Sequence, residues 1–172
     1  MKRHLIYLYT AIFCLLTLST TSGCDKDDDV KIIFTGKVWK MSYIFREGNP
    51  KQYVNFWYDD REAEAKSIEL QKAAGHYELE FTGAVIDGVF TGAFSGKAIN
   101  ASFTANWKAD GKNQTISTSG FRWTGEDTDV LALQFKKGME NAFKYSGDAN
   151  ALYIYYKDGE LVNVIALLPR DR

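Results

Sequence analysis

The chain has 172 residues, of which 45% are hydrophobic and 25% charged, a balance that excludes a disordered tail and a multi-span membrane protein and fits one globular domain. Aromatic residues make up 15%, and 14 glycines outnumber 2 prolines, so we expect short strands joined by glycine turns and a mainly β core. The formal net charge of −1, without a basic stripe, argues against nucleic acid as a partner.

The first 23 residues have the features of an export signal. A basic start at residues 1–4 precedes an apolar run at residues 5–18 and a small, polar stretch at residues 19–23. As a helix the apolar run would be about 21 Å long, shorter than the ~30 Å hydrocarbon core of a bilayer. The run therefore favours a removable signal over a permanent transmembrane helix.

The sequence Thr21-Ser22-Gly23-Cys24 resembles the lipobox of bacterial lipoproteins, in which cleavage precedes an acylated cysteine, although Thr21 replaces the usual Leu. The resemblance implies a lipoprotein signal peptide over residues 1–23 and lipidation of Cys24. The alternative is an ordinary secretory signal with an incidental cysteine. The other cysteine, Cys14, lies in the apolar run, so the mature chain has no thiol left for a disulfide and must be held together by packing.

The residues after Cys24 are strongly acidic. Residues 25–29 contain four acids and no apolar side chain, so we expect a solvated tether over residues 24–31 and a folded domain over residues 32–172. The cluster resembles the surface-export signal of Bacteroidetes lipoproteins, which implies a lipid-anchored outer-membrane protein that faces the cell exterior. The residues of that signal are Asp27, Asp28 and Asp29. The alternative is a polar spacer on a lipoprotein that faces the periplasm.

Alternation of apolar and polar residues predicts the first strand, with Trp39, Met41, Tyr43 and Phe45 on one buried face. Turn residues at 47–50 end this strand. Asp59 and Glu62 have capping-box spacing, which predicts a short helix over residues 62–74 that stops at Gly75.

The middle of the chain predicts hairpin-linked antiparallel strands. Tyr77, Leu79 and Phe81 alternate with Glu78 and Glu80, and strand patterns continue over residues 85–94, 99–107, 114–119 and 121–123. The small residues Ala101 and Ala105 lie between large ones, which suits a curved sheet or a small barrel.

The last third predicts a helix and a hairpin. Leu131, Phe135 and Met139 have helical spacing over residues 128–144, with Thr128 as the N-cap. Asp158-Gly159 lies between two apolar runs and predicts a tight hairpin turn, and Pro169 ends the last strand.

This order of elements resembles the META/HslJ-like domain of bacterial envelope lipoproteins. The matching residues are Gly36, Trp39, residues 94–98 with Asn100, residues 110–116 and residues 131–165. The resemblance implies a mainly β (β-rich α+β) fold: a small antiparallel curved sheet or partly open barrel with one or two helices. The chain lacks the Cys-Asn pair common in that family and has a longer insertion at residues 47–75. The family has no defined reaction, so the resemblance implies no activity.

Residues that could catalyse a reaction are sparse. The mature domain has one histidine, His76, which we expect to be exposed or to cap an element, and no cysteine beyond Cys24. Catalytic triads and multi-histidine zinc sites therefore lack parts, and the local carboxylate pair Glu78 and Glu80 fits a solvated strand face. We expect no catalytic residue, no metal and no cofactor.

Aromatic residues supply the candidate ligand site. Tyr53, Asn55 and Trp57 would share one face of a short strand, and such an aromatic-amide-aromatic row suits sugar recognition; Trp123 is the fourth candidate. The alternative is that the helix at residues 59–74 covers this face. Trp39 and Trp107 are expected in the core.

Together these features predict a lipid-anchored, non-catalytic outer-membrane lipoprotein that serves as a binding or envelope-structural module. Its expected partners are the membrane, through the lipid, and a glycan or another envelope protein. The alternative is a glycan-binding component of a surface uptake system. A hydrolase ranks third, and would require a cleft that holds His76 with two carboxylates.

Overall fold

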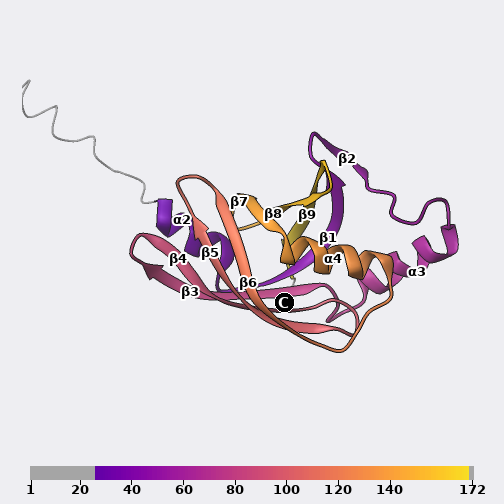
Figure 1. Cartoon of the computed structure of the whole chain (residues 1–172), viewed down its shortest axis with the longest axis horizontal. Coiled ribbons are helices and arrows are strands. Elements are labelled where there is room, and N and C mark those ends of the chain that lie inside the picture. Colours follow the sequence, from indigo (N-terminus) through magenta and orange to yellow (C-terminus); the bar gives the residue numbers. More distant parts are fainter. Residues whose placement is uncertain (1–25, 171–172) are drawn as a thin grey trace, which may run out of the picture.

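Eight antiparallel strands close into a barrel in the computed structural model of the chain, which describes residues 26–170 (Figure 1). In order of pairing the strands are β1 (Val38–Arg46), β3 (Glu78–Ile86), β4 (Val89–Lys97), β5 (Ser102–Asp110), β6 (Thr115–Thr124), β7 (Ala142–Gly147), β8 (Leu152–Asp158) and β9 (Leu161–Pro169). Pairing of β9 with β1 closes the ring, and β2 (Asn49–Tyr53) pairs with β1 outside it. The predicted mainly β fold is confirmed, and the barrel is closed rather than partly open.

Large side chains fill the barrel. Trp39 and Trp107 are 0% and 1% exposed, which confirms both as core residues. The ring of Trp107 packs against those of Phe81 and Phe90, at centroid distances of 5.1 and 5.3 Å. Its register neighbour on β4 is Gly92, where a Cβ would lie 1.9 Å from the Thr82 carbonyl oxygen. Glycine is therefore required at that position for the strands to pack as they do.

A β-bulge in β1 changes which side chains face the core. The pairing of β1 with β9 shifts between Met41 and Tyr43, so Ile44 joins the main core with Trp39 and Met41. Phe45 and Tyr43 instead belong to a second cluster, around Val164 and Ala166. The single alternating face predicted from Trp39 to Phe45 is thus wrong beyond Met41, because one extra residue in a strand reverses the faces that follow it.

Residues 26–34 form a helix instead of the expected tether. α2 (Lys26–Phe34) packs against β3, β4 and β5, and its side chains Val30 and Phe34 are fully buried. These two residues lie one helical turn apart on the same face, and the acids before them occupy the first turn. The folded domain therefore begins at α2 rather than at residue 32.

The N-caps of the two other helices lie one residue later than predicted. α3 (Arg61–Lys72) is capped by Asp60, whose carboxylate accepts a hydrogen bond from the Ala63 N–H at 3.0 Å, and not by Asp59. α4 (Val130–Glu140) is capped by Asp129 rather than Thr128. Residues 142–144, predicted as the end of this helix, belong instead to strand β7, because the backbone of residues 142–147 pairs with β8.

The strand expected at residues 53–58 is also wrong. β2 ends at Tyr53, and the Asn55 side chain accepts hydrogen bonds from the N–H groups of Trp57 and Tyr58, at 3.0 and 3.1 Å. This Asx turn bends the chain away from an extended conformation. The predicted Asp158-Gly159 hairpin is confirmed, and Pro169 is the last residue of β9.

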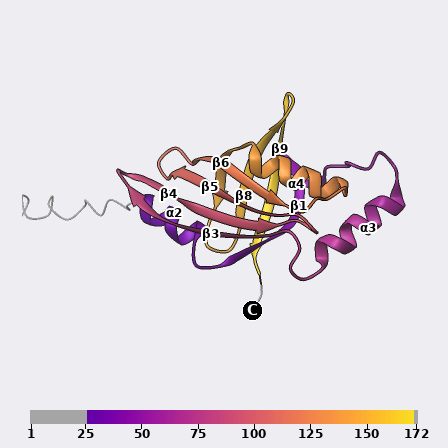
Figure 2. The same cartoon turned by 60° about the horizontal axis from the view of Figure 1, so that its bottom comes forward.

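The helices lie at different places around the barrel. α2 lies at one end, beside the tip of the β3–β4 hairpin, whereas α3 projects at the far end (Figure 2). α4 packs against β6, β8 and β9. Among residues 26–170, no helix is long and apolar enough to cross a membrane.

Candidate functional site

A cleft of about 350 Å³ separates α3 from the barrel, and we name it the α3 cleft. Its walls are β1, residues 54–57 and α3, and the side chains that define it include Tyr43, Phe56, Trp57, Glu64, Ile68 and Gln71. Most of these are apolar, and a few polar groups lie among them. This composition is typical of a site for a small organic ligand.

Hydrogen bonds fix the position of Trp57 in this cleft. Its indole N–H donates to the Ser67 hydroxyl at 2.9 Å, and that hydroxyl donates to Asp129 Oδ2 at 2.6 Å. The other carboxylate oxygen, Oδ1, accepts from the Ala132 N–H at 3.0 Å and from the Tyr77 hydroxyl at 3.2 Å. Ser67 is 1% exposed, so the chain of bonds is internal. These hydrogen bonds join the turn that contains Trp57, α3, α4 and the start of β3 in one network.

The network also affects the protonation of Tyr77. Burial, followed by the charge of Asp129, raises the pKa of the Tyr77 phenol above its ordinary value of 10.0. The phenol therefore stays protonated at neutral pH and acts as a hydrogen-bond donor.

A second cavity, of about 550 Å³, is also lined by Trp57, and its other lining residues include His76, Asp127 and Asp129. This is the combination named above for a hydrolase. However, His76 Nδ1 contacts the Leu70 carbonyl at 2.9 Å, and the Ser67 hydroxyl donates to Asp129 rather than to His76. The carboxylate of Asp127 accepts hydrogen bonds from three consecutive backbone N–H groups, those of residues 99–101. Because each of these groups has a structural partner, their arrangement gives no support to the hydrolase alternative.

The predicted ligand residues are not brought together. Asn55 and Trp57 lie in the same turn, Tyr53 ends β2, and Trp123 lies on β6. The half-buried Trp123 donates from its indole N–H to Glu140 Oε1 at 2.8 Å, and Lys136 Nζ lies 4.6 Å from its ring centroid. Trp123 therefore contacts α4 and lines a different, smaller cavity. Trp57 contacts α3 through Ser67. This contact agrees with the alternative given for Trp57, in which the helix covers its side chain.

Tyr58, which was not among the residues predicted from the sequence, has a side chain that is 91% exposed. Its φ of 48° and that of Asp59, 75°, place both residues in the left-handed region. Such a backbone is uncommon for residues other than glycine, and it turns the Tyr58 ring into solvent. No sequence pattern indicated this conformation, because it depends on the Asx turn at Asn55.

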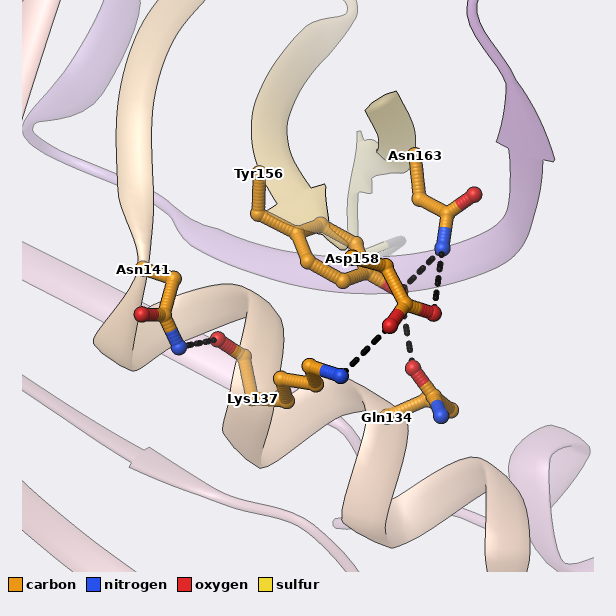
Figure 3. Close-up of polar contacts among 6 residues, drawn as sticks. All are labelled: Gln134, Lys137, Asn141, Tyr156, Asp158 and Asn163. Carbon is orange, nitrogen blue, oxygen red and sulfur yellow. Dashed lines mark hydrogen bonds and ion pairs between the residues drawn. The ribbon is translucent and has the colours of Figure 1, made fainter. Parts of the chain in front are cut away.

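A second group of polar residues, which the sequence did not indicate, lies beneath α4 (Figure 3). Lys137 Nζ lies 2.5 Å from Asp158 Oδ1, and the Tyr156 hydroxyl donates to Gln134 Oε1 at 3.2 Å. Asn163 is fully buried, and its amide donates to Tyr156 at 3.3 Å. These bonds join α4 to the β8–β9 hairpin.

Two buried atoms at this place lack a hydrogen-bond partner among the described residues: Asn163 Oδ1 and Arg46 Nη1. The two residues are register neighbours on β9 and β1. None of the cavities described above reaches these atoms.

Neither a metal-binding cluster nor the predicted lipidation site lies among the described residues. Within residues 26–170, no three His, Cys, Asp or Glu side chains gather in a way that could hold a metal ion. The predicted signal peptide at residues 1–23 and the predicted lipidation site Cys24 lie outside the described residues. Asp27, Asp28 and Asp29 belong to the first turn of α2, and Asp29 is exposed.

Comparison with known proteins identifies a family and a fold. Residues 25–169 match the family described as "Domain of unknown function (DUF4847)". The structure is similar to the crystal structure of a DUF4847 family protein from Bacteroides vulgatus ATCC 8482, with a TM-score of 0.58 and 22% sequence identity, over 83% of this chain and 99% of that one. Among curated proteins no match is found. At this level of identity, the structural similarity shows the fold alone.

Proposed function

The chain belongs to the DUF4847 family, and for this member we propose a role as a lipid-anchored, non-catalytic binding module of the outer membrane that faces the cell exterior. The α3 cleft is the observation that carries the binding role. It is mainly apolar, and the Ser67–Asp129 network holds its Trp57 in a fixed position. A preorganised aromatic wall lowers the entropy cost of binding a ligand.

The proposed anchor is lipid on Cys24. It is supported by the basic start, the apolar run and the lipobox-like sequence that ends at Cys24. Cys24→Ala should block processing, so that the chain stays uncleaved or is mislocalised. Metabolic labelling with a radioactive fatty acid and fractionation of membranes measure this. Normal cleavage with unchanged membrane association would contradict the proposal.

The α3 cleft fits a small ligand with an apolar face, and a fluorescent naphthalene sulfonate dye is a suitable first probe. Ile68 lies at the cleft and is 38% exposed, so Ile68→Arg places a charged side chain at the opening without disturbing the core. We expect dye affinity to fall about tenfold or more. The matched control is Leu161→Arg, an exposed position on the β8–β9 hairpin that lies outside the cleft. Equal affinity in both variants would show that the dye binds elsewhere.

A glycan-binding component of a surface uptake system is the second candidate function. The specific observation in its favour is the Tyr58 ring, which is 91% exposed beside the cleft residue Trp57. Exposed aromatic rings stack on the CH groups of sugars. In a glycan-array assay, a bound sugar should be lost on Tyr58→Ala and retained on Tyr58→Phe. If no sugar binds to the wild type, this candidate is wrong.

The META/HslJ-like resemblance stays a prediction about relationship. It implies a shared order of elements over the part of the chain that starts at Gly36. A superposition of the eight-stranded barrel on a solved member of that family tests it, and a different strand order would contradict it.

A further inference from the structure

The tip of the β3–β4 hairpin exposes a small apolar surface. Val85, Ile86 and Val89 are 47%, 58% and 37% exposed. Between them lies the two-residue turn Asp87-Gly88, in which both residues have positive φ, and Ile86 pairs directly with Val89. Asp87 is the single charged residue in the sequence from 83 to 92.

The composition of this tip differs from that of the other hairpin turns. The pair that flanks the β5–β6 turn is Asp110 and Thr115, and the pair that flanks the β8–β9 turn is Asp158 and Leu161, so each pair has at least one polar residue, unlike Ile86 and Val89. Polar residues are the usual choice where a hairpin meets water. From Thr82 to Ile86 every residue of β3 is exposed, so the fold itself does not require apolar side chains at the tip. A contiguous exposed apolar surface indicates a contact outside the chain.

The location of the tip indicates what that contact is. α2 packs against β3 and β4, and both views show the tip at the same end of the barrel as α2 (Figures 1 and 2). Ile32 of α2 is a further exposed apolar residue there, at 58%. Cys24 precedes Lys26 by two residues, a span of about 7 Å at most. Lipid on Cys24 would therefore bring the bilayer to this end of the barrel.

We propose that the β3–β4 tip, formed by Val85, Ile86 and Val89, inserts into the lipid bilayer beside the anchor. A single anchor leaves the barrel free to tilt, whereas a second apolar contact fixes which end faces the membrane. The α2 end then lies on the bilayer, and α3 with its cleft points away from it. The inference rests on the proposed lipidation of Cys24 and adds the orientation of the domain.

Site-directed spin labelling tests the orientation. Acylation would block Cys24 in the mature chain, so a cysteine introduced by Ile86→Cys is the only free thiol. Leu161→Cys is the matched control, because Leu161 has similar exposure, 53%, on the β8–β9 hairpin away from α2. Each lipidated protein is labelled with a nitroxide, reconstituted into phosphatidylcholine vesicles and examined for accessibility to oxygen and to a water-soluble nickel chelate. Both side chains are exposed, so neither substitution removes a core contact, and thermal unfolding checks that both variants fold.

We expect the label at position 86 to gain accessibility to oxygen and lose accessibility to nickel on reconstitution, while the label at position 161 stays accessible to nickel. If the protein sediments with the vesicles but both labels stay in water, the bilayer contact is wrong and the anchor stands. If the protein does not sediment, the anchor is wrong and the contact with it. A label at 86 that is immobilised and shielded from both reagents would indicate a protein partner, which also overturns the lipid contact.

Discussion

At the scale of single residues, a few polar side chains organise the candidate site. Asp129 caps α4, accepts from Ser67 of α3 and accepts from Tyr77 before β3, so one carboxylate joins three parts of the chain. Trp57 is held at the end of this chain of bonds. The sequence marks Asp129 only as one acid among several near the start of a helix. Its partners are 52 and 62 residues away, and no local pattern records such distances.

Trp107→Ala should lower the free energy of unfolding by about 3–5 kcal/mol. The residue is 1% exposed, contacts several aromatic rings, and donates from its indole N–H to the Thr82 carbonyl at 3.0 Å. Chemical denaturation of a chain that starts at residue 26 measures the change. Trp123→Ala is the control, since Trp123 is half-buried and should cost less. A loss below about 1 kcal/mol for Trp107→Ala would contradict its role in the core.

Stability should decrease as the pH rises above about 10. Burial is the main cause that raises the folded-state pKa of both Tyr77 and Tyr156 above the ordinary value of 10.0. Phenols of this kind contribute stability that is complete below the unfolded-state pKa and is lost as the pH rises through the folded-state pKa. Denaturation measured at a series of alkaline pH values gives this slope.

Tyr77→Phe is the variant that isolates one phenol, and it should reduce the alkaline slope. Desolvation is the main cause that lowers the pKa values of Lys37 and Lys40, and these shifts change the pH dependence of stability in the opposite direction. The wild-type slope alone therefore does not isolate the contribution of the phenols. An unchanged slope in Tyr77→Phe would show that this phenol ionises as freely in the folded state as in the unfolded chain.

At the scale of elements, α2 shows how a polar run can begin a core helix. Its first turn is acidic, but Val30 and Phe34 fill the end of the barrel. The Phe34 ring lies 4.6 Å from that of Trp107 and 4.9 Å from that of Tyr145. The acidic composition predicted a solvated tether, because the acids are adjacent in the sequence. Val30 and Phe34 are four residues apart and share a face only when the chain is helical. Acids in a first turn are also favoured by the helix dipole.

A chain that starts at residue 35 should be less stable than one that starts at residue 26, by several kcal/mol, because it lacks both buried side chains of α2. Thermal unfolding followed by circular dichroism compares the two chains. Phe34→Ala in the longer chain is the matched point variant and should reproduce much of the loss. Equal melting temperatures for the two chains would support the predicted start of the folded domain at residue 32.

At the scale of the whole molecule, different helices lie at the two ends of the barrel. The acids Asp27, Asp28 and Asp29 belong to α2 at one end, whereas α3, which lines the cleft, lies at the other end (Figure 1). We retain the hypothesis that these acids are an outward-export address. Their position in a helix gives them a structural use as well, and the two roles have to be separated by experiment.

Changing Asp27, Asp28 and Asp29 together to Ala should leave the protein in the membrane but protect it from protease added to intact cells. The matched control changes all three to Glu, which keeps the negative charge in the first turn of α2. This control should remain accessible to protease. If the wild-type protein already resists protease on intact cells and is digested after lysis, the domain faces the periplasm.

The sequence by itself determined the mainly β class, the positions of most strands, the last hairpin and the burial of Trp39 and Trp107, because each follows from short-range alternation or from turn chemistry. The prediction that Cys24 is lipidated also rests on the sequence alone. Only the tertiary structure decided closure of the barrel by β1 and β9, the side of Phe45 and the strand state of residues 142–147. Tertiary structure likewise assembled the α3 cleft and separated Trp57 from Trp123. These features depend on a β-bulge and on hydrogen bonds between residues far apart in the chain, and neither leaves a local pattern in the sequence.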